Sequence, residues 1–148
     1  MIPSDFIETG FFLPKIMKIE HIGIAVKDIE KSNELFATLF NKPSYKMEDV
    51  ESEGVKTSFF QIGESKIELL QATNEDSPIA KFIAKKGEGM HHIAFEVENI
   101  EAEIARLQGE GFTLIHDIPK LGADNKKIAF LHPKSTNGVL VELCQDRG

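Results

Sequence analysis

The chain has 148 residues, 41% of them hydrophobic and 28% charged, a balance that is typical of a folded globular protein and excludes a disordered one. Its formal net charge of −7 argues against general nucleic-acid binding, because such binding needs a basic surface. One cysteine, Cys144, excludes an intrachain disulfide framework and fits a reducing, cytoplasmic location, and no apolar run is long enough to cross a membrane.

Residues 1–17 are expected to form an N-terminal extension ahead of the folded part of the chain. The segment carries several large apolar side chains, but also the acidic residues Asp5 and Glu8. A secretory signal needs basic residues before its apolar run, and a transit peptide needs arginines. The segment has neither feature.

The first half of the remaining chain predicts a strand, a helix and three more strands. Small or polar residues alternate with Ile and Val over 21–26, which is the period of a half-buried strand. Asp28 is a helix-capping residue type, and the apolar spacing after it predicts an amphipathic helix over 29–40. The three strands expected next are 44–50, 55–62 and 66–71.

The second half repeats this order of elements. The strand 92–97 matches 21–26, Asn99 matches Asp28 as a helix cap, and 100–108 is the matching helix. The three strands expected next are 112–118, 126–131 and 139–145. Between the halves, a Ser-Pro pair and helical apolar spacing predict a bridging helix.

The repeat therefore predicts an α+β fold of two tandem βαβββ modules. We expect the first module at 18–76, a linker helix at 77–89 and the second module at 90–148. Together they would form one domain over 18–146, with a cupped mixed sheet.

The two halves carry a histidine and a glutamate at matching places. His21 matches His92 in the first strand, and Glu68 matches Glu142 within the last strand. A lone histidine is usually a core or surface residue, and a lone glutamate in an apolar strand usually points to solvent. Because the repeat supplies a histidine and a glutamate in each half, packing about a pseudo-twofold axis would bring two imidazoles and two carboxylates to one point. These ligands suit a divalent cation such as Co²⁺, Mn²⁺, Ni²⁺ or Zn²⁺, with Mg²⁺ also possible, and leave room for substrate.

Other reactive side chains are expected to lie outside this site. By the alternation of a strand, His91 should point to the face opposite His92. His116 and His132 fall at a strand end and in a proline turn, where surface roles are expected. Cys144 is expected to be a small buried hydrophobe.

The matched residues and several longer stretches resemble the vicinal oxygen chelate superfamily, which includes glyoxalase I, extradiol dioxygenases and antibiotic-resistance proteins. Within it, the chain is most similar to the methylmalonyl-CoA epimerase family, over about residues 19–145. The stretches that carry this resemblance are 21–26, 77–82, 89–95 and, most specifically, 132–135 with 138–143.

The resemblance implies a fold of the glyoxalase/bleomycin-resistance type and names His21, Glu68, His92 and Glu142 as metal ligands, with Co²⁺ favoured. It implies an isomerase of propionate metabolism that interconverts the R and S forms of methylmalonyl-CoA by removing the α-proton to give a metal-stabilised enolate. Glu142 would then be both ligand and catalytic base. The same resemblance implies an acyl-CoA substrate and a homodimer, with neither nucleic acid nor membrane as partner.

One position departs from the family pattern. Some members carry a carboxylate on the third strand as a proton-transfer group, whereas the matching residue here is Thr57, whose hydroxyl is a poor base near neutral pH. Glu48, Glu51 and Glu53 lie just upstream, where an acidic solvated loop is expected. The second base is therefore left open.

Two other functions stay open on the sequence. A glyoxalase I-type isomerase (a lactoylglutathione lyase) would use the same four ligands on a glutathione hemithioacetal, although the stretch 132–143 favours the epimerase. A non-catalytic module that sequesters a ligand would need no metal, so the full ligand set counts against it. Candidate contacts for the phosphates of coenzyme A are Lys120, Lys126, Lys127 and Lys134.

Overall fold

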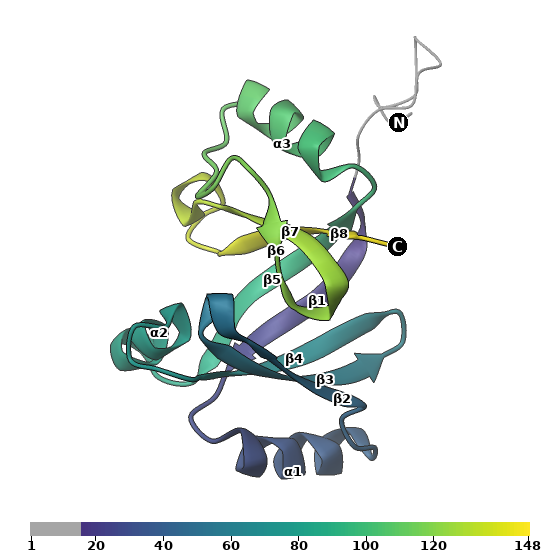
Figure 1. Ribbon diagram of the computed structural model, residues 1–148, viewed down its shortest axis with the longest axis vertical. Helices are drawn as coiled ribbons and strands as arrows, with labels where there is room; N and C mark the ends of the chain where they lie inside the picture. The colour runs from purple at the N-terminus through teal and green to yellow at the C-terminus, as the bar shows by residue number, and fades with distance from the viewer. Residues whose placement is uncertain (1–15) are drawn as a thin grey trace.

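The computed structural model describes residues 16–148, so the predicted N-terminal extension lies outside the described residues except for its last two. The fold is the expected α+β arrangement, a single curled sheet of eight strands with three α-helices (Figure 1). The strands are β1 (Ile16–Ala25), β2 (Lys46–Val50), β3 (Val55–Ile62), β4 (Ser65–Ala72), β5 (Gly89–Val97), β6 (Lys120–Leu121), β7 (Lys126–Leu131) and β8 (Val141–Asp146). The α-helices are α1 (Ile29–Phe40), α2 (Pro78–Lys86) and α3 (Ile100–Gly109). Within residues 16–148, no helix combines the length and the apolar composition needed to cross a bilayer.

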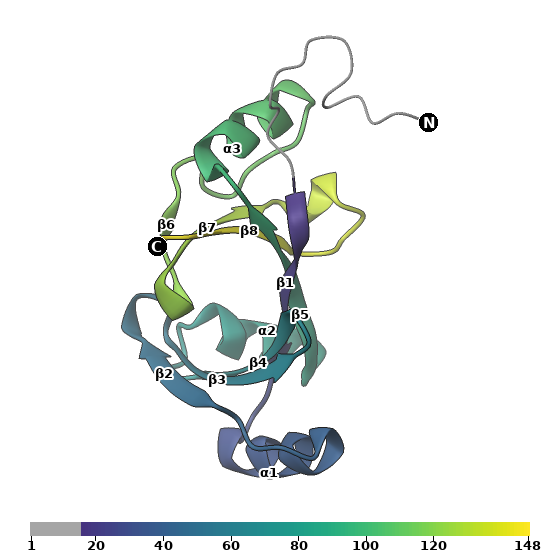
Figure 2. The same ribbon diagram turned by 90° about the vertical axis from the view of Figure 1, so that its right-hand side faces the viewer.

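The strand order repeats about the middle of the sheet. The order is β2-β3-β4-β1-β5-β8-β7-β6, so each half runs outward from its own first strand. The first strands, β1 and β5, pair antiparallel, and each pairs parallel with the last strand of its half, β4 or β8. Figure 2 shows that the sheet curls into a half-barrel, which confirms the predicted cup. The domain limits drawn from the sequence stay a prediction.

The helix termini repeat as well. Asp28 accepts hydrogen bonds from two backbone N–H groups at the start of α1, and Asn99 accepts one at the start of α3. A glutamine from the last strand of each half adds a further acceptor: Gln71 for α1 and Gln145 for α3. Each last strand is thereby tied to the helix of its own half, and N–H groups that a helix leaves unpaired are satisfied.

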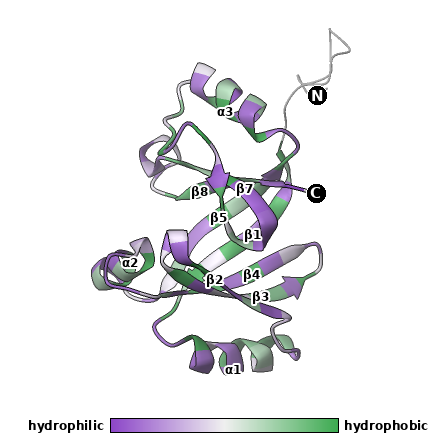
Figure 3. Ribbon diagram, in the orientation of Figure 1, coloured by the Kyte–Doolittle hydropathy of each residue, from purple (hydrophilic) through white to green (hydrophobic). Residues whose placement is uncertain are grey.

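The core lies mainly between the outer face of the sheet and the two helices α1 and α3. Helix α3 packs Ile100, Ile104 and Leu107 against Leu131 and Leu143 from the second half of the sheet. An equivalent cluster lies under α1 in the first half. Hydrophobic and hydrophilic residues alternate along the strands, as expected for a sheet with two different faces (Figure 3). Helices α1 and α3 therefore cover the outer face, whereas α2 packs Ile79 against Val55 and Leu70 and contributes to the wall of the inner face.

The prediction of a strand over 112–118 is wrong. Only Leu114 makes an isolated bridge, to Leu131, and regular pairing with β7 begins later, in the short strand β6. Ile115 and Ile118 are exposed, and Pro119 has no N–H to donate to a ladder. The apolar run that resembled a strand is a loop at the edge of the sheet.

Candidate metal centre

A bulge stands directly before each candidate histidine. The pairing of β1 with β5 is irregular at three places, and two of them leave Glu20 on β1 and His91 on β5 as extra residues. These residues come immediately before His21 and His92. A bulge interrupts the alternation of side chains, so an extra residue and its neighbour can face the same way. All four side chains line the same cavity on the inner face of the sheet.

The two histidines and Glu142 form a compact triangle. His21 Nε2 lies 2.9 Å from His92 Nε2. Glu142 Oε1 lies 3.1 Å from His92 Nε2 and 3.6 Å from His21 Nε2. All three side chains are buried. Ligand atoms around a cation with bonds of about 2.1 Å are themselves about 3 Å apart, so these separations suit one coordination sphere.

Glu68 approaches the imidazole of His21 on the side of its other nitrogen, Nδ1. Glu68 Oε2 lies 3.1 Å from His21 Nδ1, and Glu20 Oε1 lies 2.6 Å from that nitrogen. Both carboxylates are buried. The structure thus brings the other three predicted ligands to His21. His92 and Glu142 lie on its Nε2 side, and Glu68 lies on its Nδ1 side together with a third carboxylate, Glu20.

The charges of the site act strongly on one another. Burial would raise the pKa of Glu142, but the charge of His21 and hydrogen bonds from both histidines lower it overall. At Glu68, burial raises the pKa to about 7, although the positive charge of His21 acts to lower it. Burial would lower the pKa of His21, but the charges of Glu68 and Glu142 raise it well above 6.5. The cluster is therefore rich in negative charge and favours a bound cation.

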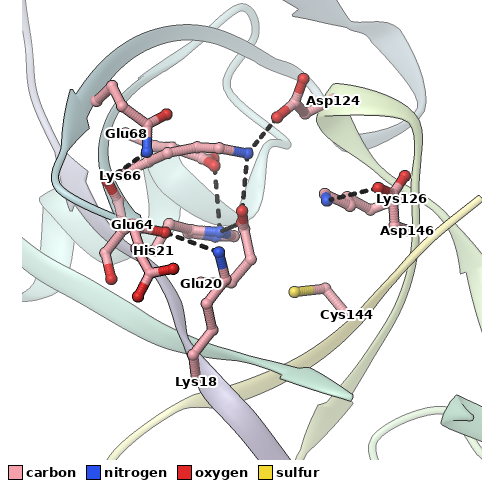
Figure 4. A network of polar contacts seen from close by, with 12 residues as sticks. Lys18, Glu20, His21, Glu64, Lys66, Glu68, Asp124, Lys126, Cys144 and Asp146 are labelled. Carbon is pink, nitrogen blue, oxygen red and sulfur yellow. Dashed lines mark hydrogen bonds and ion pairs between the residues drawn. The ribbon is translucent and has the colours of Figure 1, made fainter. Parts of the chain in front are cut away.

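Glu20 belongs to a chain of alternating charges that crosses between the halves (Figure 4). Its Oε2 lies 2.7 Å from Lys66 Nζ, and Lys66 also pairs with Asp124 from the turn before β7. Asp124 further pairs with Lys46 at 2.7 Å, and its backbone N–H donates to Glu48. Burial would raise the pKa of Glu20, but hydrogen bonds from His21 and Lys66 lower it to about 2.

A cavity of about 290 Å³ opens above the candidate ligands. Its walls are mostly apolar and include Val50, Val55, Leu70, Ile79, Ile115 and Leu140. Thr57 is fully buried in this wall, and its hydroxyl has no hydrogen-bond partner among residues 16–148. A second ion pair joins the halves beside the cavity, with Lys120 Nζ 2.8 Å from Glu53 Oε2.

The prediction that His91 faces away from His92 is wrong, because the bulge turns it toward the cavity. The two Nδ1 atoms are 3.0 Å apart, and burial, helped by the charge of His92, lowers the pKa of His91 to about 4. His132 is exposed and accepts a hydrogen bond from a nearby backbone N–H, as expected for a turn, whereas exposed His116 reaches the cavity rim. Cys144 is fully buried among apolar side chains, as predicted.

The candidate lysines separate into two pairs. Lys120 and Lys126 line the cavity. Lys127 pairs with Glu101 on the surface instead, and Lys134 lies in a separate shallow depression. Two lysines of the four are therefore placed to meet a ligand that extends out of the cavity.

Three residues of the site escaped the sequence analysis: Glu20, Lys66 and Asp124. Strand alternation places Glu20 opposite His21, and only the bulge reverses this. One signal was present, since alignment of the halves puts polar residues, Glu20 and His91, directly before both histidines. Nothing in the sequence pairs Asp124 with Lys66, because that contact depends on how the turn before β7 closes over the first half.

Comparison with known proteins identifies the class. Residues 20–130 match the family model described as Glyoxalase/Bleomycin resistance protein/Dioxygenase superfamily. The chain belongs to this superfamily, as the sequence predicted, and its half-barrel is the fold of that family.

Individual relatives indicate a narrower group within this superfamily. The protein YqjC of Bacillus subtilis, named as uncharacterized, is 40% identical over 131 residues, which are 88% of this chain and 94% of the relative. The ethylmalonyl-CoA/methylmalonyl-CoA epimerase of Cereibacter sphaeroides is 39% identical over 132 residues, 88% of this chain and 98% of the relative. A solved structure of a Streptomyces coelicolor methylmalonyl-CoA epimerase variant, in complex with 2-nitronate-propionyl-CoA, is 35% identical and covers 90% of this chain and 97% of its own, with a TM-score of 0.87. The predicted resemblance to these epimerases is confirmed, and with it the predicted enzyme class, an isomerase.

Proposed function

We propose that the chain interconverts the R and S forms of methylmalonyl-CoA at a divalent metal held by His21, Glu68, His92 and Glu142. The observation that carries the proposal is that two candidate ligand groups share His21, one with His92 and Glu142 and the other with Glu68, in the lining of a mostly apolar cavity. The relatives support it, because two of them are named for this reaction.

The residues present fit a cation. The Nε2 atoms of His21 and His92 face each other at 2.9 Å, and Glu142 lies beside both. A cation between these atoms would take the place of a shared proton. Glu68 would complete the set by turning about its side-chain torsions, away from Nδ1 of His21. When bound, a divalent cation supplies a Lewis acid that makes a proton next to a thioester carbonyl easier to remove.

Glu142 is assigned as one proton-transfer group. Its carboxylate is ionised and lies at the edge of the cavity base, so it can take the α-proton from one face of the substrate carbon. The electron pair left on carbon is delocalised onto the thioester oxygen. A second acid delivers a proton to the other face and so gives the opposite configuration, and Glu142 then releases its proton to solvent. The carbon skeleton leaves unchanged.

The cavity walls are assigned to the substrate. Thr57 is fully buried in the cavity wall, and its hydroxyl has no partner among the described residues. It is assigned a hydrogen bond to the substrate, which would satisfy that buried group. Lys120 and Lys126 line the cavity and are assigned to anionic groups of coenzyme A. The analogue in the Streptomyces complex agrees with this chemistry, because a nitronate carries delocalised negative charge on oxygens, like the anion formed when an α-proton leaves.

The test is proton exchange at the substrate's α-carbon. Protein stripped of metal and reloaded with Co²⁺ is mixed with methylmalonyl-CoA in D₂O, and exchange is followed by NMR together with the ratio of R to S forms. We expect exchange and interconversion, and neither in the metal-free protein. Turnover of the methylglyoxal–glutathione hemithioacetal without exchange would indicate a glyoxalase instead, and binding without either reaction would indicate a sequestering module.

Three further features belong to the same proposal. We propose Co²⁺ as the preferred ion, a homodimer as the assembled state and the cytoplasm as the location. Exposed Met17, Ile19 and Met90 offer apolar surface for self-association. Affinities measured for a series of divalent ions test the first feature, and sedimentation equilibrium tests the second.

A further inference from the structure

We propose that Glu20 is a positioning residue of the metal centre. It holds His21 so that Nε2 points to the cation, and Lys66 and Asp124 hold Glu20 in turn. The inference rests on the metal site proposed above and adds a residue that lies outside the four ligands.

The first support is the position of Glu20 in the fold. It is the extra residue of a bulge and shows only 2% of its surface to solvent. A regular strand would direct this carboxylate to the face opposite His21. Burying a carboxylate is costly unless it is paired and hydrogen-bonded, and both of its oxygens have partners here. The bulge thus delivers a second carboxylate to the histidine.

The second support is the contact that Glu20 makes. Its Oε1 lies 2.6 Å from Nδ1 of His21, and a carboxylate can only accept, so Nδ1 carries the proton and donates it. The Nε2 atom is then the one that binds a cation, which takes the place of the proton shared with His92. Carboxylates behind ligating histidines generally fix the tautomer and ring orientation and raise the affinity of the ligand. Once Glu68 turns to the cation, Glu20 is the acceptor that stays on Nδ1.

The third support is the clamp on Glu20. Lys66 stands beside His21 in the parallel pairing of β4 with β1, and its ammonium lies 2.7 Å from Glu20 Oε2. Lys66 is held from the other side by Asp124, in the turn before β7 (Figure 4). Because this turn belongs to the second half of the chain, the clamp links the orientation of a ligand in one half to a contact made by the other.

The test compares Co²⁺ binding to the wild type with binding to Glu20→Gln, which keeps the shape and removes the charge. Metal-free proteins are titrated with Co²⁺, and both the affinity and the visible absorption of the ion are recorded. We expect Glu20→Gln to bind about 10- to 100-fold more weakly, with the same number of ligands to the ion. Lys66→Met keeps the Glu20 carboxylate and should show a smaller loss. Glu101→Gln is the matched control, since it breaks an exposed ion pair on α3 and should bind like the wild type.

The outcomes separate the two proposals. A wild type without affinity for Co²⁺ would refute the metal site itself. A wild type and a Glu20→Gln variant of equal affinity would refute only the role of Glu20. An absorption spectrum that shows a lost ligand in Glu20→Gln would also refute it, because Glu20 would then bind the metal directly. Equal Co²⁺ affinity of Lys66→Met and the wild type would refute the role of Lys66 in holding Glu20.

A measurement on the unaltered chain covers the case in which Glu20→Gln does not fold. In Zn²⁺-loaded protein with ¹⁵N-labelled histidine, NMR identifies the protonated ring nitrogen of His21. The proposal requires a proton on Nδ1 and none on Nε2. A proton on Nε2, with Nδ1 bound to the ion, would overturn it.

Discussion

The two halves of the sheet repeat the ligands but not their surroundings. His21 and His92 are equivalent, as are Glu68 and Glu142, which oppose Phe59 and Phe130 in matching registers. Around them the halves diverge, and the first half is the more polar. It has Glu20, Thr57 and Lys66 where the second half has His91, Ile128 and Leu140.

Under the proposed function, this difference separates two tasks. A shared ion needs similar donors from both sides, so the repeat keeps them. Orienting a ligand and gripping an asymmetric substrate need different groups on each side, so the repeat is broken there. The first half supplies a charged network behind His21 and an unpaired hydroxyl in the wall, whereas the second half supplies apolar wall from Leu140 and Ile128.

The largest expected effect on kcat comes from substituting the two equivalent glutamates, one at a time. Glu142→Gln should lower kcat about a thousandfold while the fold survives, because it removes a proton-transfer group. Glu68→Gln keeps an oxygen donor and should lower metal affinity about tenfold, with kcat at saturating metal changed much less. Steady-state kinetics with circular dichroism checks both. Equal losses of kcat in the two variants would make the halves functionally alike and contradict the assignment of Glu142.

A second difference between the halves lies two residues after each histidine. Ala94 follows His92, but Gly23 follows His21 and stands opposite the His92 ring. A Cβ at Gly23 would come within 2.6 Å of His92 Nδ1, closer than real contacts allow. Gly23→Ala should therefore displace that ring and weaken Co²⁺ binding by at least about tenfold.

The control for this variant is Gly109→Ala. A Cβ at Gly109, at the end of α3, meets no atom within 4 Å, so its Co²⁺ affinity should equal that of the wild type. Wild-type affinity in Gly23→Ala as well would mean that His92 does not need its observed orientation.

The smallest expected effect concerns the position where the first half has Thr57 and the second has Ile128. The Thr57 hydroxyl has no partner within the part of the chain that the structure describes, and a buried unpaired hydroxyl costs free energy. Thr57→Val should therefore stabilise the protein by about 1 kcal/mol in chemical denaturation. The same change should lower kcat/KM up to about tenfold, because a hydrogen bond to the substrate is lost. Higher stability with unchanged kcat/KM would show that the hydroxyl does not meet the substrate.

The repeat made most of this architecture predictable. Matching strands, caps and ligand positions required only local periodicity, and the sheet order follows from pairing two equal halves. The bulges at Glu20 and His91 were not predictable, because strand periodicity assumes regular pairing and a single inserted residue reverses the faces around it. The missing strand at 112–118 has a similar origin, since apolar alternation does not reveal whether a neighbouring strand is available for pairing.

A crystal structure of the Co²⁺-loaded protein, with anomalous diffraction recorded at the cobalt edge, tests directly whether the two halves bind one shared ion. We expect one cobalt per chain, bound by Nε2 of His21 and His92 and by carboxylate oxygens of Glu68 and Glu142, with Glu20 hydrogen-bonded to Nδ1 of His21. Cobalt bound elsewhere, or coordinated by residues of one half alone, would contradict it.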